Sequence, residues 1–350
     1  MPIFTRGKRA DIIVAYQNDL DNAEANFNMR YDANSCPKED IADFALEEWI
    51  GGGAFGTVYK ARKDGNVYAI KRQLKGDRCV RLILEKRTQF AFKNIFLVEL
   101  FSTWKTKLQT FMVMDFATYG DLYNIGPIPH PEAKLKLLLG QVVLGLEYIH
   151  RCNMIYRDLK PSNILVFEKG LLKLCDFGVT VRASSAVIGT FGTLRFMAPE
   201  MHGDKPYTCA VDWWALGIMM YELLTENGAT PFYDVDDDLS RLQKIDLICH
   251  TDPLELQNPP HSNAAKAMVA QLLFKDPNQR LGFGLGGCDG VKKHVWFSDI
   301  DFNNLIVEQD FPEIELPPPI EGTQQGLPEF KNDPPHSPGP DPGNDPFADF

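Results

Sequence analysis

The stretch Tyr156-Arg157-Asp158-Leu159-Lys160-Pro161-Ser162-Asn163 decides the fold, and thirteen residues after Asn163 the chain continues with Asp176-Phe177-Gly178. Ala198-Pro199-Glu200 and Asp212-Trp213-Trp214 follow in that order. The order and the spacing of these motifs, together with a glycine-rich motif further upstream, make coincidence negligible. These motifs therefore indicate one particular fold rather than only a broad class of folds.

The glycine-rich motif occupies residues 51–58 and reads Gly-Gly-Gly-Ala-Phe-Gly-Thr-Val, a GxGxxGxV pattern. Glycines at these positions let the backbone approach phosphate oxygens and direct N–H groups at them. Alone the pattern is weak, and a glycine-rich turn without a ligand remains an alternative. A dinucleotide-binding fold requires a helix directly after the glycines, whereas Thr57-Val58-Tyr59 is typical of a strand.

Two charged residues strengthen the phosphate interpretation. Lys71 ends the strand-like run Tyr68-Ala69-Ile70-Lys71, and Glu85 lies in a predicted helix over residues 80–90. Each alone is typical of a solvated surface charge. In combination with the glycines, they suggest a cation that reaches a phosphate and a carboxylate that orients it.

Composition limits the class of protein. The 350 residues include 36 Lys and Arg against 47 Asp and Glu, so the net charge of −11 argues against a nucleic-acid binder and favours cationic partners. Seven cysteines without a CxxC pair suit a reducing compartment. No apolar stretch is long enough to span a membrane. We expect an intracellular protein, in the cytoplasm or the nucleus.

The chain divides into segments of different character. Residues 1–40 form a polar extension of uncertain structure, and eleven of the 24 prolines lie from Phe311 onward. Between these ends, strands are predicted over 46–71, with a hairpin at Asp64-Gly65, and over 111–116. Helices are predicted over 132–151, 210–226 and 261–274. A small β-rich lobe followed by a larger helical lobe places a ligand cleft at their junction.

These motifs resemble those of eukaryotic protein kinases over roughly residues 44–297. The AGC group of serine/threonine kinases, which includes cAMP-dependent protein kinase, is the most similar. The evidence is Tyr156 before Arg157-Asp158, the run His294-Val295-Trp296-Phe297, and Phe347-Ala348-Asp349-Phe350.

The resemblance implies an α+β, bilobal protein kinase fold. Its domain would cover 41–297, with a β-rich N-lobe over about 41–117 and a mainly helical C-lobe over about 118–297. Residues 298–350 would form an AGC-like tail that wraps the N-lobe and docks Phe347 and Phe350 in a pocket there.

The resemblance also implies ATP and Mg²⁺ as cofactors and assigns catalytic roles. Asp158 would orient the substrate hydroxyl and accept its proton, and Lys160 would neutralise the transferring phosphoryl group. Asn163 and Asp176 would hold Mg²⁺, which prefers hard oxygen ligands. Lys71, paired with Glu85, would grip the α- and β-phosphates.

Nucleotide contacts follow in the same way. Val58, Ala69 and Leu165 would enclose the adenine, and the backbone of Asp115 and Ala117 would hydrogen-bond its edge. The complete implied nucleotide site is Gly51, Gly52, Gly53, Ala54, Phe55, Gly56, Val58, Ala69, Lys71, Met114, Asp115, Ala117, Asp121, Leu165 and Asp176. Asp212 and the Glu200–Arg280 pair would be structural.

The implied substrate is a protein. Lys160 and Thr193 favour serine or threonine as the target, and Asp121 and Glu222 fall where the family binds arginines upstream of it. Ser162, however, stands where arginine-selecting members often carry Glu. We expect selection of arginine three residues upstream and, more weakly, two upstream, by a monomeric catalytic unit under an upstream kinase or a regulatory subunit.

Regulation is expected at three places. Thr190 is the candidate activating phosphosite, although it lies one residue out of the usual register, and Ser184 and Ser185 are alternatives. Ser337 lies near the family's tail phosphosite, and Phe347 and Phe350 form the hydrophobic motif.

Two departures keep a pseudokinase, a nucleotide-binding scaffold without turnover, as the alternative. Lys71 and Glu85 are only fourteen residues apart, a few fewer than usual. Gln89 stands where the family places an apolar residue, and a buried polar group costs about 1–3 kcal/mol unless it is hydrogen-bonded.

Overall fold

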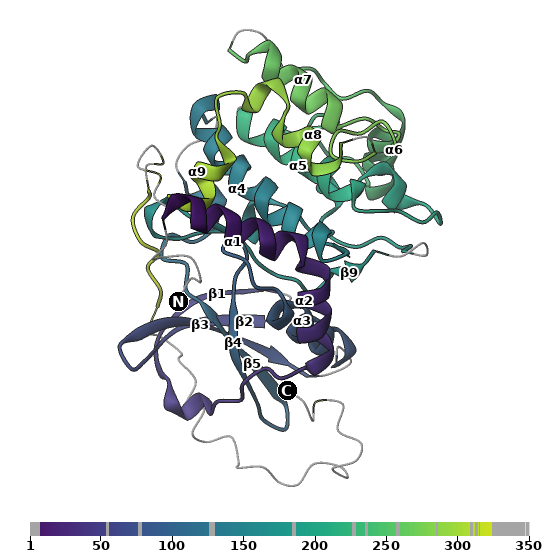
Figure 1. The fold of residues 1–350 in the computed structure, drawn as a ribbon. Coiled ribbons are helices and arrows are strands. Elements are labelled where there is room, and N and C mark those ends of the chain that lie inside the picture. The colour runs from purple at the N-terminus through teal and green to yellow at the C-terminus, as the bar shows by residue number, and fades with distance from the viewer. Residues whose placement is uncertain are drawn as a thin grey trace.

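The computed structural model describes residues 8–53, 56–75, 79–125, 130–183, 187–225, 229–234, 237–256, 260–284, 286–308 and 316–323, and positions 311, 314, 347 and 350. Within these residues the expected two-lobed α+β architecture is confirmed. Figure 1 shows the sheet in one lobe and most helices in the other.

The small lobe is built on a five-stranded antiparallel sheet in the order β1-β2-β3-β5-β4. The strands are β1 (Ala45–Gly53), β2 (Gly56–Lys63), β3 (Asn66–Leu74), β4 (Leu100–Lys105) and β5 (Gln109–Asp115). The predicted hairpin joins β2 to β3, and Asp64 and Gly65 both have positive φ, 50° and 80°. Two left-handed residues match the right-handed twist of the flanking strands.

One long helix crosses the small lobe. This helix, α3 (Cys79–Ala91), follows β3 after residues 75–78 and carries Glu85 in its middle. The short connection accounts for the fourteen-residue spacing between Lys71 and Glu85.

The large lobe is helical, and its core contains the tryptophans of α5. Every residue of α5 is buried, including Trp213 and Trp214, so this helix forms the centre of the lobe. The predicted helix over 132–151 is α4, and the other two predicted helices are α5 and α7 with ends displaced by two residues at most. The helices are α4 (Glu132–Arg151), α5 (Ala210–Leu224), α6 (Arg241–His250), α7 (Asn263–Leu272), α8 (Gly287–Lys292) and α9 (Phe302–Val307).

Short strands between α4 and α5 carry the catalytic motifs. They are β6 (Met154–Ile155), β7 (Ile164–Val166), β8 (Leu172–Leu174) and β9 (Val181–Arg182), which pair as β6 with β9 and β7 with β8.

The N-terminal extension, whose structure the sequence left uncertain, contains α1 (Arg9–Asp21) and α2 (Ala23–Ala33). Figure 1 shows α1 along the helical lobe and α2 beside α3. Phe27 of α2 packs against Phe92 with ring centroids 4.9 Å apart, and Arg30 Nε donates to the Ala91 carbonyl at 2.7 Å.

Described residues of the C-terminal segment contact the small lobe. Trp49 and Thr323 exchange backbone hydrogen bonds at 2.8 and 3.0 Å. Phe347 and Phe350 are buried in a cluster with Leu82, Leu100 and Met112, which belong to α3, β4 and β5. Ser337 lies outside the described residues.

Candidate active site

A cavity of about 560 Å³ lies between the two lobes and contains most of the implied nucleotide residues. This volume falls within the usual range for small-molecule sites. The implied residues that line it are Gly51, Gly52, Gly56, Val58, Ala69, Lys71, Met114, Asp115, Ala117, Asp121, Lys160, Asn163, Leu165 and Asp176. Gly53 ends β1 beside it, and Ala54 and Phe55 lie outside the described residues.

The glycine segment runs along the end of β1 and the start of β2. Gly53 pairs with Gly56, so the two strands close tightly at this point. Gly56 has φ 133°, and a Cβ there would lie 2.3 Å from the Arg72 carbonyl oxygen. Only glycine fits this position.

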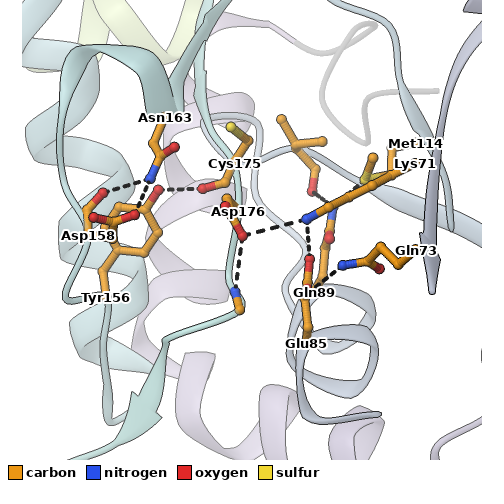
Figure 2. Close-up of polar contacts among 12 residues, drawn as sticks. Lys71, Gln73, Glu85, Gln89, Met114, Tyr156, Asp158, Asn163, Cys175 and Asp176 are labelled. Atoms are coloured by element: carbon orange, nitrogen blue, oxygen red, sulfur yellow. Dashed lines mark hydrogen bonds and ion pairs between the residues drawn. The ribbon is translucent and has the colours of Figure 1, made fainter. Parts of the chain in front are cut away.

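Lys71 of β3 forms two ion pairs inside the cavity (Figure 2). Its Nζ lies 2.6 Å from Glu85 Oε1 and 3.6 Å from Asp176 Oδ1. Burial alone would lower the pKa of Lys71, but the carboxylates of Glu85 and Asp176 outweigh burial and hold this pKa above its ordinary value. The lysine is therefore a fixed cation, and helix α3 lies close enough to the sheet to complete the pair.

Gln89 lies one turn after Glu85 and lines the back of the cavity. It is 2 % exposed, and its amide Nε2 approaches the Val98 carbonyl oxygen at 3.4 Å and Met114 Sδ at 3.1 Å. The Gln89 amide, which replaces the apolar residue expected at this position, thus has two hydrogen-bond partners, although both bonds are weak.

Figure 2 shows Asp158 on the opposite side of Asp176 from Glu85, and Asp158 is held through both carboxylate oxygens. Lys160 Nζ and Asn163 Nδ2 donate to Oδ2 at 2.8 and 2.9 Å, and Thr193 Oγ1 donates to Oδ1 at 3.1 Å. Lys160 Nζ also donates to Thr193 Oγ1 at 2.9 Å. Together these contacts orient a carboxylate, a lysine and a threonine toward one point.

Buried Asp212 fixes the backbone that carries this carboxylate. The backbone amides of Tyr156 and Arg157 donate to its Oδ2 and Oδ1 at 2.9 and 2.8 Å. Arg157 and Asp176 both adopt the left-handed region, with φ 71° and 55°. Such strained non-glycine backbone persists where surrounding contacts impose it, and it clusters at functional sites.

The expected structural pair has the implied geometry. Arg280 Nη1 and Nη2 donate to the two oxygens of Glu200 at 2.6 and 3.0 Å, and the arginine is almost fully buried. This bidentate contact joins the Ala-Pro-Glu motif to the segment that follows α7.

Asn163 and Asp176 fit the metal that the resemblance implies. Asn163 uses its amide nitrogen to donate to the carbonyl and the carboxylate of Asp158, which leaves its amide oxygen as a ligand. In the described part of the chain, no group of three or more His, Cys, Asp or Glu side chains could hold an ion unaided. Mg²⁺ suits such a sparse set, because it takes one or two protein oxygens plus phosphates and water.

The Arg157 side chain contacts residues on both sides of Thr190. The guanidinium lies 4.3 Å from the Phe191 ring centroid, and it donates to Tyr207 Oη at 3.0 Å and to the Val179 carbonyl at 2.6 Å. Thr190 Oγ1 donates to the Met201 carbonyl at 3.0 Å. Activation through Thr190 stays a prediction, and Ser184 and Ser185 lie outside the described residues.

Several cavity residues were missed by the sequence analysis. Val98 is buried and Cys175 is partly buried, and both give only a generic apolar signal. Ile320 comes from the C-terminal segment, where Ile320 N donates to the Thr118 carbonyl at 2.8 Å. Nothing in the sequence around Ile320 indicates that contact.

In the described residues, helices that combine the length and the apolar character needed to cross a bilayer are absent. The family model described as "Protein kinase domain" matches residues 44–297.

Relatives agree with this match. The "cAMP-dependent protein kinase type 3" of Saccharomyces cerevisiae is 32% identical over 306 residues, which cover 84% of this chain and 73% of that protein. The "Ribosomal protein S6 kinase alpha-1" of Homo sapiens is 33% identical over 283 residues, 77% of this chain and 37% of that protein. The "cAMP-dependent protein kinase catalytic subunit" of Dictyostelium discoideum is 33% identical over 284 residues, which cover 78% of this chain and 42% of that protein.

The chain thus spans about three quarters of the yeast relative and less than half of the other two. With the two-lobed fold, the family match and these relatives in agreement, the chain belongs to the protein kinase domain family and to its AGC group.

Proposed function

We propose that this chain is an active serine/threonine protein kinase that transfers the γ-phosphate of ATP to hydroxyl groups of proteins. One observation carries the proposal. Lys71 and Asp176, which form one ion pair, line the same cavity as Lys160 and Asn163, which hold the Asp158 carboxylate. A phosphate bound by Lys71 would lie near the Asp158 carboxylate, which would orient the hydroxyl group that receives the phosphoryl group.

The residues have distinct proposed roles. Lys71 binds the α- and β-phosphates, Asp158 orients the acceptor hydroxyl and takes its proton, and Lys160 balances charge on the transferring group. ATP supplies the phosphoryl group, and Mg²⁺, which Asn163 and Asp176 would hold, offsets the charge of its phosphates. Because the transition state is loose, positioning and charge stabilisation account for nearly all of the catalysis.

We further propose a basic protein substrate. Lys160 donates to Thr193 and Thr193 donates to Asp158, and this arrangement beside the carboxylate favours serine or threonine as the target. Asp121 lines the same cavity as Lys160 and can pair with a substrate arginine, and the net charge of −11 attracts basic segments.

The test measures transfer from labelled ATP with Mg²⁺ to a serine peptide with an upstream arginine. Asp158→Ala should abolish transfer. Asp204 is an exposed carboxylate that does not line the cavity, so Asp204→Ala should retain transfer. Absence of transfer by the native chain, even after treatment with an upstream kinase and with a mixed peptide library, would contradict the proposal. ATP-dependent thermal stabilisation without transfer would instead identify the pseudokinase.

A further inference from the structure

Glu222, one of the two acidic residues expected to bind a substrate arginine, is already paired with an arginine of its own chain. It lies near the end of α5 and is 1 % exposed. Arg195, in the short helix Leu194–Phe196, forms an ion pair with Glu222 Oε1. Tyr123 Oη donates to the same oxygen at 2.9 Å, and Arg195 donates to Tyr123 Oη.

In this cluster, Arg195 and Tyr123 both contact Oε1 of the Glu222 carboxylate, whereas Oε2 is buried and has no hydrogen-bond partner among the described residues. Burial raises the pKa of Glu222, and the Arg195 guanidinium opposes that rise. Arginine remains protonated at all working pH values and desolvates more readily than lysine, so it is suited to a buried pair. Removing one partner of such a pair leaves an uncompensated buried charge. Because the charge of Glu222 is already balanced by Arg195, this carboxylate attracts a second cation less strongly than an unpaired carboxylate does.

The cluster adjoins the place where the substrate backbone would lie. Arg195 follows two residues after Thr193, whose hydroxyl contacts Asp158. Tyr123 follows two residues after Asp121, which lines the cavity. The Arg195 side chain is 26% exposed, so the pair is reachable from the surface at its cationic side.

Asp121 differs from Glu222 in its exposure and its partners, although burial raises the pKa of both carboxyl groups. Its carboxylate caps a short helix by accepting from Tyr123 N at 3.1 Å and from Asn124 Nδ2 at 3.3 Å. Among the residues that the structure describes, no cation lies within ion-pair distance of it. Its remaining acceptor capacity faces the cavity and can serve a guanidinium.

We propose that Arg195 is a specificity-determining residue that fills the acidic subsite at Glu222, so that the kinase selects only one substrate arginine, through Asp121. The inference rests on the proposed function and narrows it. The sequence suggests arginine selection at three and, more weakly, at two residues upstream. Glu222, whose carboxylate is already paired, is assigned to the weaker position, two residues upstream, and the native chain does not select arginine there.

The experiment compares peptides that differ only in having Arg or Ala two residues upstream of the target serine, with Arg fixed three upstream. For each protein the ratio of the two kcat/KM values is taken on one preparation, which cancels differences in the folded fraction. The native chain should give a ratio near one. Arg195→Ala should raise the ratio about tenfold or more, as expected when a desolvated carboxylate gains a cationic partner.

Further variants keep the test decisive. Arg195→Gln removes the charge but keeps a long polar side chain beside Tyr123, and it should raise the ratio if Arg195→Ala does not fold. The double variant Arg195→Ala/Glu222→Gln has a neutral subsite, and its ratio should return to near one. Asp121→Asn should lower selection three residues upstream without changing the ratio at the position two upstream.

The outcomes separate the two proposals. A tenfold preference for arginine two residues upstream in the native chain would overturn the inference alone, as would ratios near one in both Arg195 variants while they phosphorylate the reference peptide. No transfer by any of these proteins to any peptide would overturn the proposed function and the inference with it.

Discussion

Replacing Gln89 by leucine should stabilise the kinase and preserve its activity. Gln89 is buried on α3 and makes two weak hydrogen bonds, to Val98 O at 3.4 Å and Met114 Sδ at 3.1 Å. Each contributes about 0.5 kcal/mol, at the low end for a protein hydrogen bond. Burying the amide costs about 1–3 kcal/mol. Leucine avoids that cost at similar volume, so the free energy of unfolding should rise by about 1 kcal/mol.

The measurement is thermal unfolding with kinetics on the same preparations. For a domain of this size, a gain of 1 kcal/mol corresponds to a rise in Tm of about 2–4 °C. Since the Lys71–Glu85 contact at 2.6 Å does not involve Gln89, kcat/KM should remain within about threefold.

Gln89→Ala is the matched control, because it removes the same hydrogen bonds and also opens a cavity. It should lie about 2–5 kcal/mol below the leucine variant in stability. A fall in both Tm and kcat/KM in the leucine variant would refute this reasoning. It would show that the two hydrogen bonds hold α3 more strongly than their distances indicate.

Two other perturbations test the packing. His130 is buried, and burial, together with Lys134, lowers its pKa from 6.5 to about 4. The unfolded chain therefore binds more protons than the folded chain below pH 6.5, and the free energy of unfolding decreases as the pH is lowered. Urea unfolding should show that the free energy of unfolding is about 2 kcal/mol lower at pH 5 than at pH 7, and His130→Gln should abolish this difference. An equal decrease in the variant would contradict the role of His130. Phe350→Ala empties the buried ring position near Lys86, whose Nζ lies 5.5 Å from the ring centroid. It should cost about 3 kcal/mol of local stability and speed amide exchange in α3, and unchanged exchange would show that Phe350 does not support the helix.

Local signals explain what could be predicted. The hairpin at Asp64-Gly65 follows from residues that tolerate positive φ, and α4 follows from a sustained apolar period that begins after Pro131. Glu85 was paired with Lys71 because it lies in a predicted helix and is the only acidic residue between positions 78 and 98. For the hairpin and α4 the information lies within the element itself, and for the ion pair it lies within fourteen residues.

Features that depend on distant contacts were not predictable. Helices α1 and α2 show little apolar periodicity, and α2 is positioned by contacts such as Phe27 with Phe92. The Arg195–Glu222 pair joins residues 27 positions apart on separate helices. No spacing rule connects them, so a carboxylate expected to receive a substrate arginine could not be recognised as occupied.

Helix α3 is held from several directions, which bears on how the kinase reaches an active arrangement. Lys71 holds it toward the sheet through Glu85, and Arg87 on its outer side donates to the Tyr31 carbonyl of α2 at 2.9 and 3.2 Å. The Arg87 guanidinium also lies 4.4 Å from the Tyr31 ring centroid. Phe350 adds a buried ring beside the same helix. Because these contacts come from three separate segments of one chain, loss of any one leaves the others to oppose outward movement of α3. Weakening Gln89 should therefore be tolerated, whereas combined loss of the Phe350 ring and the Arg87–Tyr31 contact should reduce activity more than the two changes do separately.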